Sequence, residues 1–531
     1  MYITQNDILN MRIRAGRPMS DGEILFDILR DHKQSPEYQH AVEGQRYYLA
    51  LHDVLGHDFR QEHLTEDVED PETGARAPQN TVFTNPNRSN HHAANPFFRE
   101  QVIQKASYLL GKEPSVSVEG AEASRELAGY AEALMNTTDA AFNRAVKRWC
   151  TQASIGGRAF LHEYKDADGA LKQAVVTYTN ALPVYDQEYE ETLQELIYFY
   201  ETKLRLGADR WQTITHAEWW TKDGVTYWIH DTGEAFRPDP EKPGVQPHYW
   251  EVTLANAGPD GVTMVEVSRE GKVFERFPWI ELKNNEDGTG DLLGVKDLID
   301  AYDLVQNMGT NNILDFNEFF AIIQGFGGEQ ASTVVRKLRV NRAVNVGSAA
   351  QSGNIELKQL DLGMQGRIDW LKALRDAIYE FGMAVDVKSV ENLGSAPSGT
   401  SLKFQYTLLD LKAENMISEM RPALSEHFWF VTQEINRAQG TEYDASLVDV
   451  SFNKSLIVND SDTVAIITQS ADIVPERILL AHHPFVTDPD AAMKEMEEQR
   501  KRKVREQQKL MGAYGFGPEK DEDGEKDEDQ A

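Results

Sequence analysis

The spacing of apolar residues changes twice along this chain, which restricts it to a fold that joins helices to a separate β-rich part. Apolar residues recur at helical spacing over the first 156 residues and again beyond residue 284. Between them, residues 157–283 carry short alternating or β-branched runs. The chain has 531 residues, too many for one hydrophobic core. We therefore expect an α+β protein with several structural regions.

Three local signals mark where helices begin. Ser20 and Glu23 have the spacing of a capping box ahead of an apolar stripe. Ser35 followed by Pro36 marks a second helix start, because proline is well tolerated in the first helical turn. Asp291 is expected to cap a long helix that follows it.

Turn-forming residues divide the chain further. The sequences DADG at 166–169 and KDG at 222–224 have the composition of tight turns, so each predicts a β-hairpin. Residues 65–80 are polar and rich in turn formers, which predicts a loop.

The charge is strongly negative, with 86 acidic against 54 basic side chains and a formal net charge of −32. Proteins that hold DNA tightly usually present a basic surface, because neutralising phosphates supplies much of the affinity. Two interpretations remain: the protein never meets nucleic acid, or it meets DNA without holding it. No apolar run is long enough to cross a bilayer, and no secretory signal is visible. We therefore expect no membrane partner.

Motifs for common chemistry are absent from the sequence. The pairs Gly111-Lys112 and Gly271-Lys272 lack the upstream glycine of a phosphate-binding loop, which excludes an ATP-driven motor of that type. The sequence contains no HExxH, GxSxG or CxxC motif. We expect no cofactor, no structural metal and no catalytic residues. Cys150, the single cysteine, is interpreted as a buried structural thiol in a protein suited to a reducing cytoplasm.

Glu286, Asp287 and Asp291 form the densest acidic cluster in the folded part. Such carboxylates can bind a divalent cation or belong to a two-metal nuclease. We favour a solvated loop before a helix, since no distant acidic motif accompanies them. The pairs His91-His92 and His482-His483 are weaker metal candidates, because adjacent side chains seldom converge on one ion.

Several segments, taken in order, resemble the portal proteins of long-tailed bacteriophages, in the branch typified by phages of Bacillus. The resemblance covers residues of about 45 to 490, and five motifs in order are more specific than any single one. Ala50 stands where the family usually has glycine, and a proline expected after Lys112 is displaced to Pro114. The segments are GQRYYLALHDV (44–54), NPFFREQVIQKASYLLGK (95–112), GGRAF (156–160), NNEDGTGDLLGVKDLIDAYDLVQN (284–307) and SAPSGTSLKFQYTLLDLKA (395–413).

The resemblance implies a portal fold with a helical stem and crown and a β-rich wing, assembled as a ring of about twelve subunits. The implied regions are a wing (1–283, β-rich over 157–283), a stem helix (284–323, its helix from 291), a clip (324–365), a second stem helix (366–385), a tunnel loop (386–398), a long helix (399–440), a crown (441–518) and a disordered acidic tail (519–531).

The resemblance also implies partners and a place of action. A portal protein forms the channel at one capsid vertex through which double-stranded DNA is packaged, retained and ejected. It works in the virion after assembly in the bacterial cytoplasm. Its implied partners are other copies of itself, the terminase motor, the head–tail adaptor, and the major capsid and scaffolding proteins.

Two groups of residues are expected to carry this function. In the tunnel loop we expect Lys388, Glu391, Asn392, Gly394 and Ser395 to lie near the DNA. In the clip we expect a basic patch to dock the motor and the adaptor, with contact to DNA as the second choice. The patch consists of Arg336, Lys337, Arg339 and Arg342.

Two other classes of function stay open on the sequence. One is a metal-dependent nuclease or terminase-like packaging enzyme that uses the acidic cluster, which predicts DNA cleavage by monomers in the presence of divalent cations. The other is a different structural head protein, such as a capsid-vertex or head-completion protein. The two long helices joined by a loop rich in glycine and serine favour the portal.

Overall fold

The computed structural model describes residues 3–503 apart from seventeen gaps, of which 325–353 is the longest. The gaps are 14–16, 70–75, 87, 187–191, 208, 257–263, 316–319, 325–353, 359–363, 387, 389–398, 455–463, 465–466, 472–473, 482, 484–485 and 487–491. The chain divides into two units, one of residues 1–387 with 406–455 and the other of residues 388–405 with 456–531. Helices and sheets are mixed throughout the first unit, which is the α+β class that the sequence predicts.

The first unit begins with three helices, and the second and third start at the signals that the sequence shows. Their bounds are α1 (Gln5–Ile13), α2 (Asp21–Gln34) and α3 (Pro36–Tyr48). Ser20 and Glu23 form the reciprocal capping box at the start of α2. Ser35 accepts a hydrogen bond from the Tyr38 amide, and Pro36 occupies the first turn of α3.

A seven-stranded sheet forms much of the β-rich region. Its order is β1-β7-β8-β9-β10-β11, with β12 also beside β10, and the only parallel pair on this path is β1 with β7. The bounds are β1 (Ile3–Thr4), β7 (Ala181–Tyr185), β8 (Leu193–Arg205), β9 (Trp211–Thr221), β10 (Gly224–His230), β11 (Arg237–Pro238) and β12 (Val245–Gln246). The apolar face of α2, with Ile24 and Ile28 fully buried, covers one face of this sheet.

A smaller sheet of order β15-β5-β6 lies against helix α6. Their bounds are α6 (Ala140–Gly156), β5 (Arg158–Lys165), β6 (Leu171–Thr177) and β15 (Trp279–Lys283). Trp149 of α6 is fully buried there, and its indole N–H donates to the carbonyl of Ala159 at 3.0 Å. The predicted turns at 166–169 and 222–224 are confirmed, since they join β5 to β6 and β9 to β10.

The remaining elements of the first unit extend the core of this sheet or pair locally. They are α4 (Phe97–Leu110), β4 (Ser115–Val118), α5 (Arg125–Met135), the hairpin of β13 (Tyr249–Asn256) with β14 (Met264–Lys272), and β18 (Val448–Ser451) beside β4, with short 3-10 turns at Asp53–Gly56, Tyr178–Asn180 and Ala445–Leu447. The loop predicted over 65–80 is wrong, because β2 (Gln61–Glu69) pairs with β3 (Arg76–Thr84) over nine residues each. Thr65, Val68 and Val82 suit a strand, but the pairing that selects this state is not a local signal.

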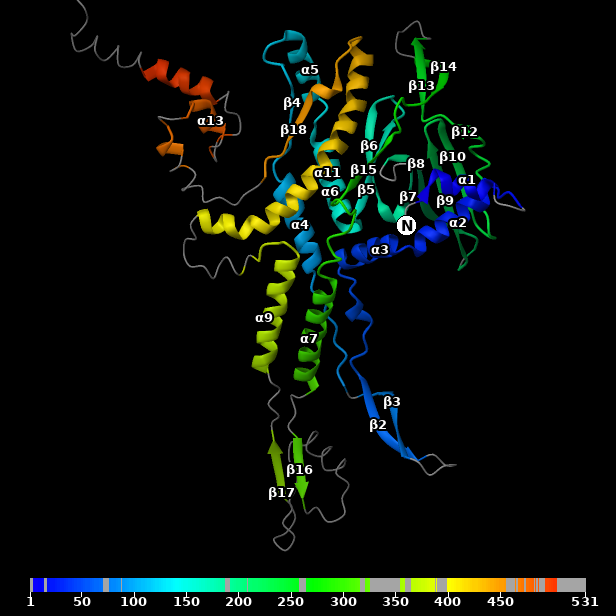
Figure 1. The fold of residues 1–531 in the computed structure, drawn as a ribbon, viewed down its shortest axis with the longest axis vertical. Helices are drawn as coiled ribbons and strands as arrows, with labels where there is room; N and C mark the ends of the chain where they lie inside the picture. Colours follow the sequence, from blue (N-terminus) through cyan, green and yellow to red (C-terminus); the bar gives the residue numbers. More distant parts are fainter. Residues whose placement is uncertain are drawn as a thin grey trace, which may run out of the picture. The chain divides into compact units, whose positions relative to one another are not determined.

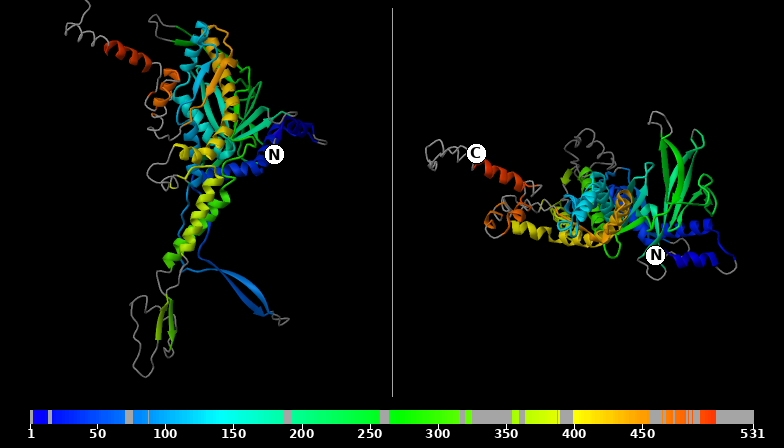
Figure 2. Two further views of the ribbon diagram at one scale, coloured as in Figure 1. Left: turned by 60° about the vertical axis from the view of Figure 1, so that its left-hand side comes forward. Right: turned by 90° about the horizontal axis from the view of Figure 1, so that it is seen from above.

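Two helices run side by side where the stem was expected, as Figures 1 and 2 show. They are α7 (Lys296–Asp315) and α9 (Met364–Phe381). The first begins five residues after the predicted cap at Asp291, whose carboxylate is buried in another set of contacts. It ends before residue 323, because Phe320–Gln324 form strand β16 and pair with β17 (Asn354–Lys358). The second helix lies within two to four residues of its predicted bounds of 366 and 385.

A 41-residue helix, α11 (Gly399–Gln439), occupies the place of the predicted long helix at 399–440 and contains Pro422. It passes from the second unit into the first at Tyr406. The described part of the expected crown includes α13 (Glu476–Ala481) and a helical stretch at 492–503. In the residues that are described, no helix is both long and apolar enough to span a membrane.

Gly157 allows a test of how closely the small sheet packs on the loop before α7. Its φ is +82°, and a Cβ at this position would lie 2.3 Å from the carbonyl oxygen of Gly288. Gly169 has a φ of +80° with nothing within 4 Å of such a Cβ, so it is a matched control. We expect Gly169→Ala to cost about 1–2 kcal/mol from backbone strain alone. Gly157→Ala should cost about 1–3 kcal/mol more, from the clash. Urea unfolding of both variants measures the difference; equal losses would contradict the close packing.

Candidate functional site: the junction that holds the helix pair

Helices α7 and α9 are held at one end by aromatic packing against α4. The ring of Phe97 makes edge contacts with Tyr302 of α7 and Tyr379 of α9, at centroid distances of 4.8 and 6.0 Å. The same cluster contains the fully buried side chains of Ile299 and Ile378. Both helices therefore rest on α4 as well as on each other.

A ladder of polar side chains fixes one face of α7 to the extended segment 89–95. Asp303, Asn307 and Asn311 are buried and spaced by four residues, so they share one helix face, and Asp315 continues the row. Their side-chain oxygens accept hydrogen bonds from the backbone amides of residues 95, 93, 91 and 89 in turn, at 2.7–3.1 Å. Asn307 and Asn311 also donate to the carbonyls of residues 93 and 91.

The ladder repeats because four residues of a helix and two residues of extended chain cover nearly the same length. Four residues of an α-helix advance about 6 Å along its axis. Two residues of extended chain advance about 6.6 Å. Every fourth side chain of α7 therefore meets every second amide of segment 89–95. The amides of residues 89, 91, 93 and 95 therefore find their acceptors on side chains of α7.

A buried histidine–carboxylate pair closes the ladder at the start of the row. His52 Nδ1 lies 2.6 Å from Asp303 Oδ2, and both side chains are completely buried. The other ring nitrogen faces the carbonyl of Tyr47 at 3.3 Å, and the imidazole stacks on the Tyr47 ring at 4.4 Å. Asp303 also accepts from the side chain of Asn95 at 2.7 Å. Both oxygens of this buried carboxylate are thus used.

A second set of charged side chains meets at the loop before α7. Lys105 of α4 donates to Asn284 Oδ1 at 2.6 Å and to Asp291 Oδ2 at 3.2 Å. Lys412 of α11 reaches the same Asp291 oxygen at 3.2 Å and donates to the Gly382 carbonyl, at the end of α9, at 2.8 Å. We call Lys105, Asn284, Asp291 and Lys412 the lysine–aspartate cluster. It ties α4, α9 and α11 to the loop that leads into α7.

The charges of this cluster shift the ionisation of its members. Burial alone would raise the pKa of Asp291, but the adjacent ammonium groups of Lys105 and Lys412 hold it below its usual value. Burial lowers the pKa of Lys412; the attraction of Asp291 opposes this and the repulsion of Lys105 adds to it. Asp291 is therefore an ion-pair partner at neutral pH.

Lys296, in the first turn of α7, forms a partly exposed network with the region before it. Its ammonium group lies 2.7 Å from Asp300 and 3.1 Å from Asp53. Tyr47 donates to the Asp300 carboxylate. Burial opposes the charge of Lys296, but Asp300 and Asp53 together raise its pKa.

Comparison with known proteins gives the family. A family of phage portal proteins, described as SPP1 Gp6-like, matches residues 28–506. The chain belongs to this family of phage portal proteins. It is 24% identical over 519 residues to the portal protein of Bacillus phage SPP1, which covers 95% of this chain and 91% of that protein. It is 25% identical over 474 residues to the portal protein of Clostridium phage phiCD119, with 87% and 93% covered. The predicted family and its function as a phage portal are confirmed.

The segments that resemble the portal family meet at this junction. His52 and Asp303 come from two of them, and Asn95 from a third. Lys412 belongs to the last of the five segments, and Asp291 to the fourth. Side chains from these segments therefore help to hold the helix pair in place.

Of the residues predicted to contact DNA or a docking partner, the structure describes only Lys388. Its side chain is exposed. The other tunnel-loop residues and the whole clip patch lie outside the described residues, and their roles remain predictions. They are Glu391, Asn392, Gly394 and Ser395 in the loop, and Arg336, Lys337, Arg339 and Arg342 in the clip.

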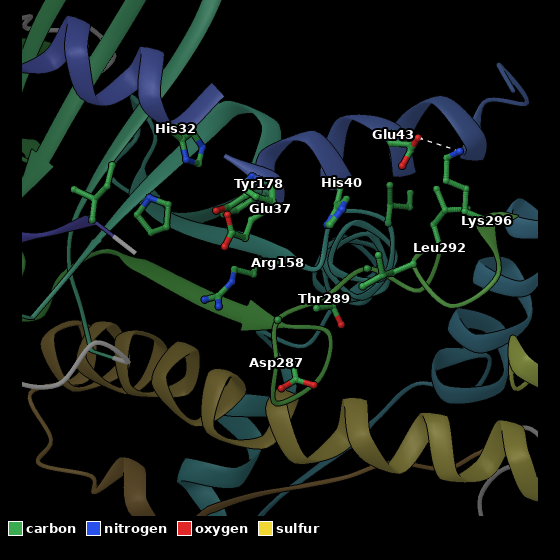
Figure 3. A pocket seen from close by; sticks show the side chains of 18 of the residues that line it. His32, Glu37, His40, Glu43, Arg158, Tyr178, Asp287, Thr289, Leu292 and Lys296 are labelled. Atoms are coloured by element: carbon green, nitrogen blue, oxygen red, sulfur yellow. Dashed lines mark ion pairs between the residues drawn. The ribbon is translucent and has the colours of Figure 1, made fainter. Parts of the chain in front are cut away.

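The acidic cluster considered for a nuclease does not converge on one site. Asp291 is engaged by two lysines, whereas Glu286 and Asp287 are exposed on the loop. Asp287 lines a cavity of about 480 Å³, opposite His40 and Glu43 of α3 (Figure 3). Within the described ranges, no group of three His, Cys, Asp or Glu side chains is placed to hold a metal ion.

The other candidate ligands have structural contacts. His91 takes part in the ladder through its backbone, and His92 bonds to the carbonyl of His57 at 2.6 Å. Cys150 is fully buried, and burial raises the pKa of its thiol to about 11, as expected of an unreactive side chain.

The ladder was missed in the sequence, although a signal was present. Asp303, Asn307, Asn311 and Asp315 repeat every four residues along one side of an amphipathic helix. Such a row on an amphipathic helix indicates a buried backbone partner rather than a solvated face.

Removal of His52 tests the buried pair. His52→Ala leaves the buried Asp303 carboxylate without its partner at Oδ2, so we expect a loss of about 3–5 kcal/mol in the free energy of unfolding. Arg30→Ala removes an exposed cation from a pair with Asp27 and should cost about 0–1 kcal/mol. Thermal and urea unfolding compare the two variants. Equal small losses would contradict a stabilising role for the junction.

Proposed function

We propose that this portal protein assembles into a closed ring of about twelve subunits through its α7–α9 pair. The observation that carries the proposal is a free apolar surface on both helices. Leu304 and Met308 of α7 are 38% and 45% exposed and lie one helical turn apart. On α9, Trp370 and Phe381 are 57% and 65% exposed. The two helices offer different surfaces, as a head-to-tail interface requires.

A face of α9 supports the idea of a channel that does not hold DNA. Asp369, Asp376 and Glu380 are exposed and separated by seven and four residues, so they form one stripe along the helix. The side chains Leu374 and Ile378 on another face are buried. We propose that the acidic stripe lines the channel. Repeated around a ring, it would repel the phosphates of double-stranded DNA and let the duplex slide.

The remaining parts of the proposal follow from the family. The tunnel loop, including Lys388, would approach the DNA, and the basic clip patch would dock the terminase motor during packaging and then the head–tail adaptor. Scaffolding and major capsid proteins would surround the portal at its vertex in the virion, after assembly in the bacterial cytoplasm. The portal itself would supply no catalysis and need no cofactor, since the motor would perform the work of packaging.

A charge on the apolar face of α7 tests the ring interface. Met308→Asp should prevent ring assembly while leaving the subunit folded, because the charge would be desolvated only on association. Met135→Asp is the matched control, since Met135 on α5 is 68% exposed and outside the proposed interface. Native mass spectrometry and circular dichroism read assembly and folding separately. Rings formed equally by both variants would refute this interface.

Charge reversal on α9 tests the channel surface. The triple variant Asp369→Lys, Asp376→Lys and Glu380→Lys should form rings that retain duplex DNA, with affinity falling steeply as salt rises. A control triple, Glu122→Lys, Glu126→Lys and Glu132→Lys, makes the same charge change on exposed side chains in and near α5. Equal DNA retention by the two triples at several salt concentrations would show that the stripe does not face the channel.

A further inference from the structure

A cavity of about 280 Å³ opens beside the lysine–aspartate cluster. Its charged lining consists of Lys105, Lys412 and Asp291. The side chains of these residues are 1%, 11% and 6% exposed. Two ammonium groups and one carboxylate give the lining a formal net charge of +1, in a chain whose total is −32. The local excess of positive charge is the feature to be explained.

The hydrogen-bond inventory of the cluster is incomplete on the donor side. Each ammonium group has three N–H donors. Lys105 uses two, on Asn284 and Asp291, and Lys412 uses two, on Gly382 and Asp291. One donor on each lysine is left without an acceptor among the residues that the structure describes.

Three of the roughly four acceptor sites of the single carboxylate are already used. One oxygen of Asp291 is shared by both lysines, and the other accepts from the Asn284 amide at 2.8 Å. Leaving a buried ammonium group incompletely paired is costly, and an anion nearby would remove that cost. Asn415, exposed on α11, lines the same cavity and offers amide donors.

We propose that this cavity binds one small oxyanion of the phosphate type. Its oxygens would accept the remaining N–H donors of Lys105 and Lys412, and Asn415 would contact it from the exposed side. The cavity has room for such an ion and some water, since one water molecule takes about 30 Å³. The bound anion would link α4, the end of α9 and α11, so it would tighten the junction that holds the helix pair.

The pKa of Lys412 is consistent with an anion at this position. The pKa of Lys412 is lowered, because burial outweighs the attraction of Asp291 and Lys105 repels it. A second negative group beside Lys412 would restore its charged form. The proposal does not depend on ring assembly or on DNA.

Isothermal titration calorimetry of the full chain with inorganic phosphate tests the site directly. We expect one phosphate per subunit in wild type, measured against sodium chloride at equal ionic strength. Lys412→Met keeps the length of the side chain and removes its charge, so phosphate binding should weaken at least about tenfold. Lys147→Met removes an exposed lysine of α6 outside the cavity and should bind phosphate as wild type does.

A second variant and a second measurement distinguish a loss of phosphate binding from a loss of folding. Asn415→Ala changes an exposed side chain and should weaken phosphate binding about threefold to tenfold without affecting folding. Phosphate should also raise the melting temperature of wild type above that in chloride, and this increment should vanish in Lys412→Met. Binding that is absent in wild type, or equal in wild type and Lys412→Met, would overturn the proposal and leave the cavity to water.

Discussion

The placement of the helix pair depends on hydrogen bonds between one helix face and a segment of extended backbone. The ladder from Asp303 to Asp315 satisfies the amides of residues 89, 91, 93 and 95, which pair with no strand in the part of the chain that the structure describes. Because both asparagines of the ladder also donate, a slip of the segment by one residue would break bonds in both directions. The ladder therefore fixes both the rotation of α7 and the register of the segment.

The buried ionisable pairs at the junction contribute more to the correct placement of the helices than to the net free energy of folding. Pairs such as His52–Asp303 and Lys105–Asp291 lose hydration on folding, so their net contribution is smaller than their short distances suggest. Breaking one partner is nevertheless expensive, because the other charge is left buried. Interactions of this kind discriminate strongly against wrong arrangements. That property suits the ring proposed above, in which the outer faces of these helices would meet two neighbours.

The side chains of α7 include some that hold the subunit together and some that stay exposed. Asn307 bonds to segment 89–95 and Tyr302 lies against Phe97, whereas Met308 is nearly half exposed. On α9, Leu374 is buried and Asp376 is exposed on another side. The proposed ring interface and channel surface would therefore use exposed side chains such as Met308 and Asp376. The lysine–aspartate cluster lies on the loop before α7, where the body of the subunit meets both helices.

The amino-acid sequence by itself determined what depends on near neighbours in the chain. The capping box of Ser20 and Glu23, the helix start at Pro36 and the turn at 166–169 form as expected, because each needs only a few consecutive residues. The α+β class and the portal family were also recognisable from periodicity and from motifs in order. The pairing of β2 with β3 was not, since two nine-residue polar strands carry no local signal strong enough to exclude a loop.

Only the tertiary structure decided the roles of Asp291 and Asp303. A carboxylate that precedes a helix looks like a cap in the sequence, but Asp291 is claimed by lysines that lie 186 residues before it and 121 residues after it. Asp303 meets a histidine 251 residues away. Sequence spacing reports which residues share a helix face. It cannot report which distant segment covers that face, because that choice is made by the burial and hydrogen bonding of the whole fold.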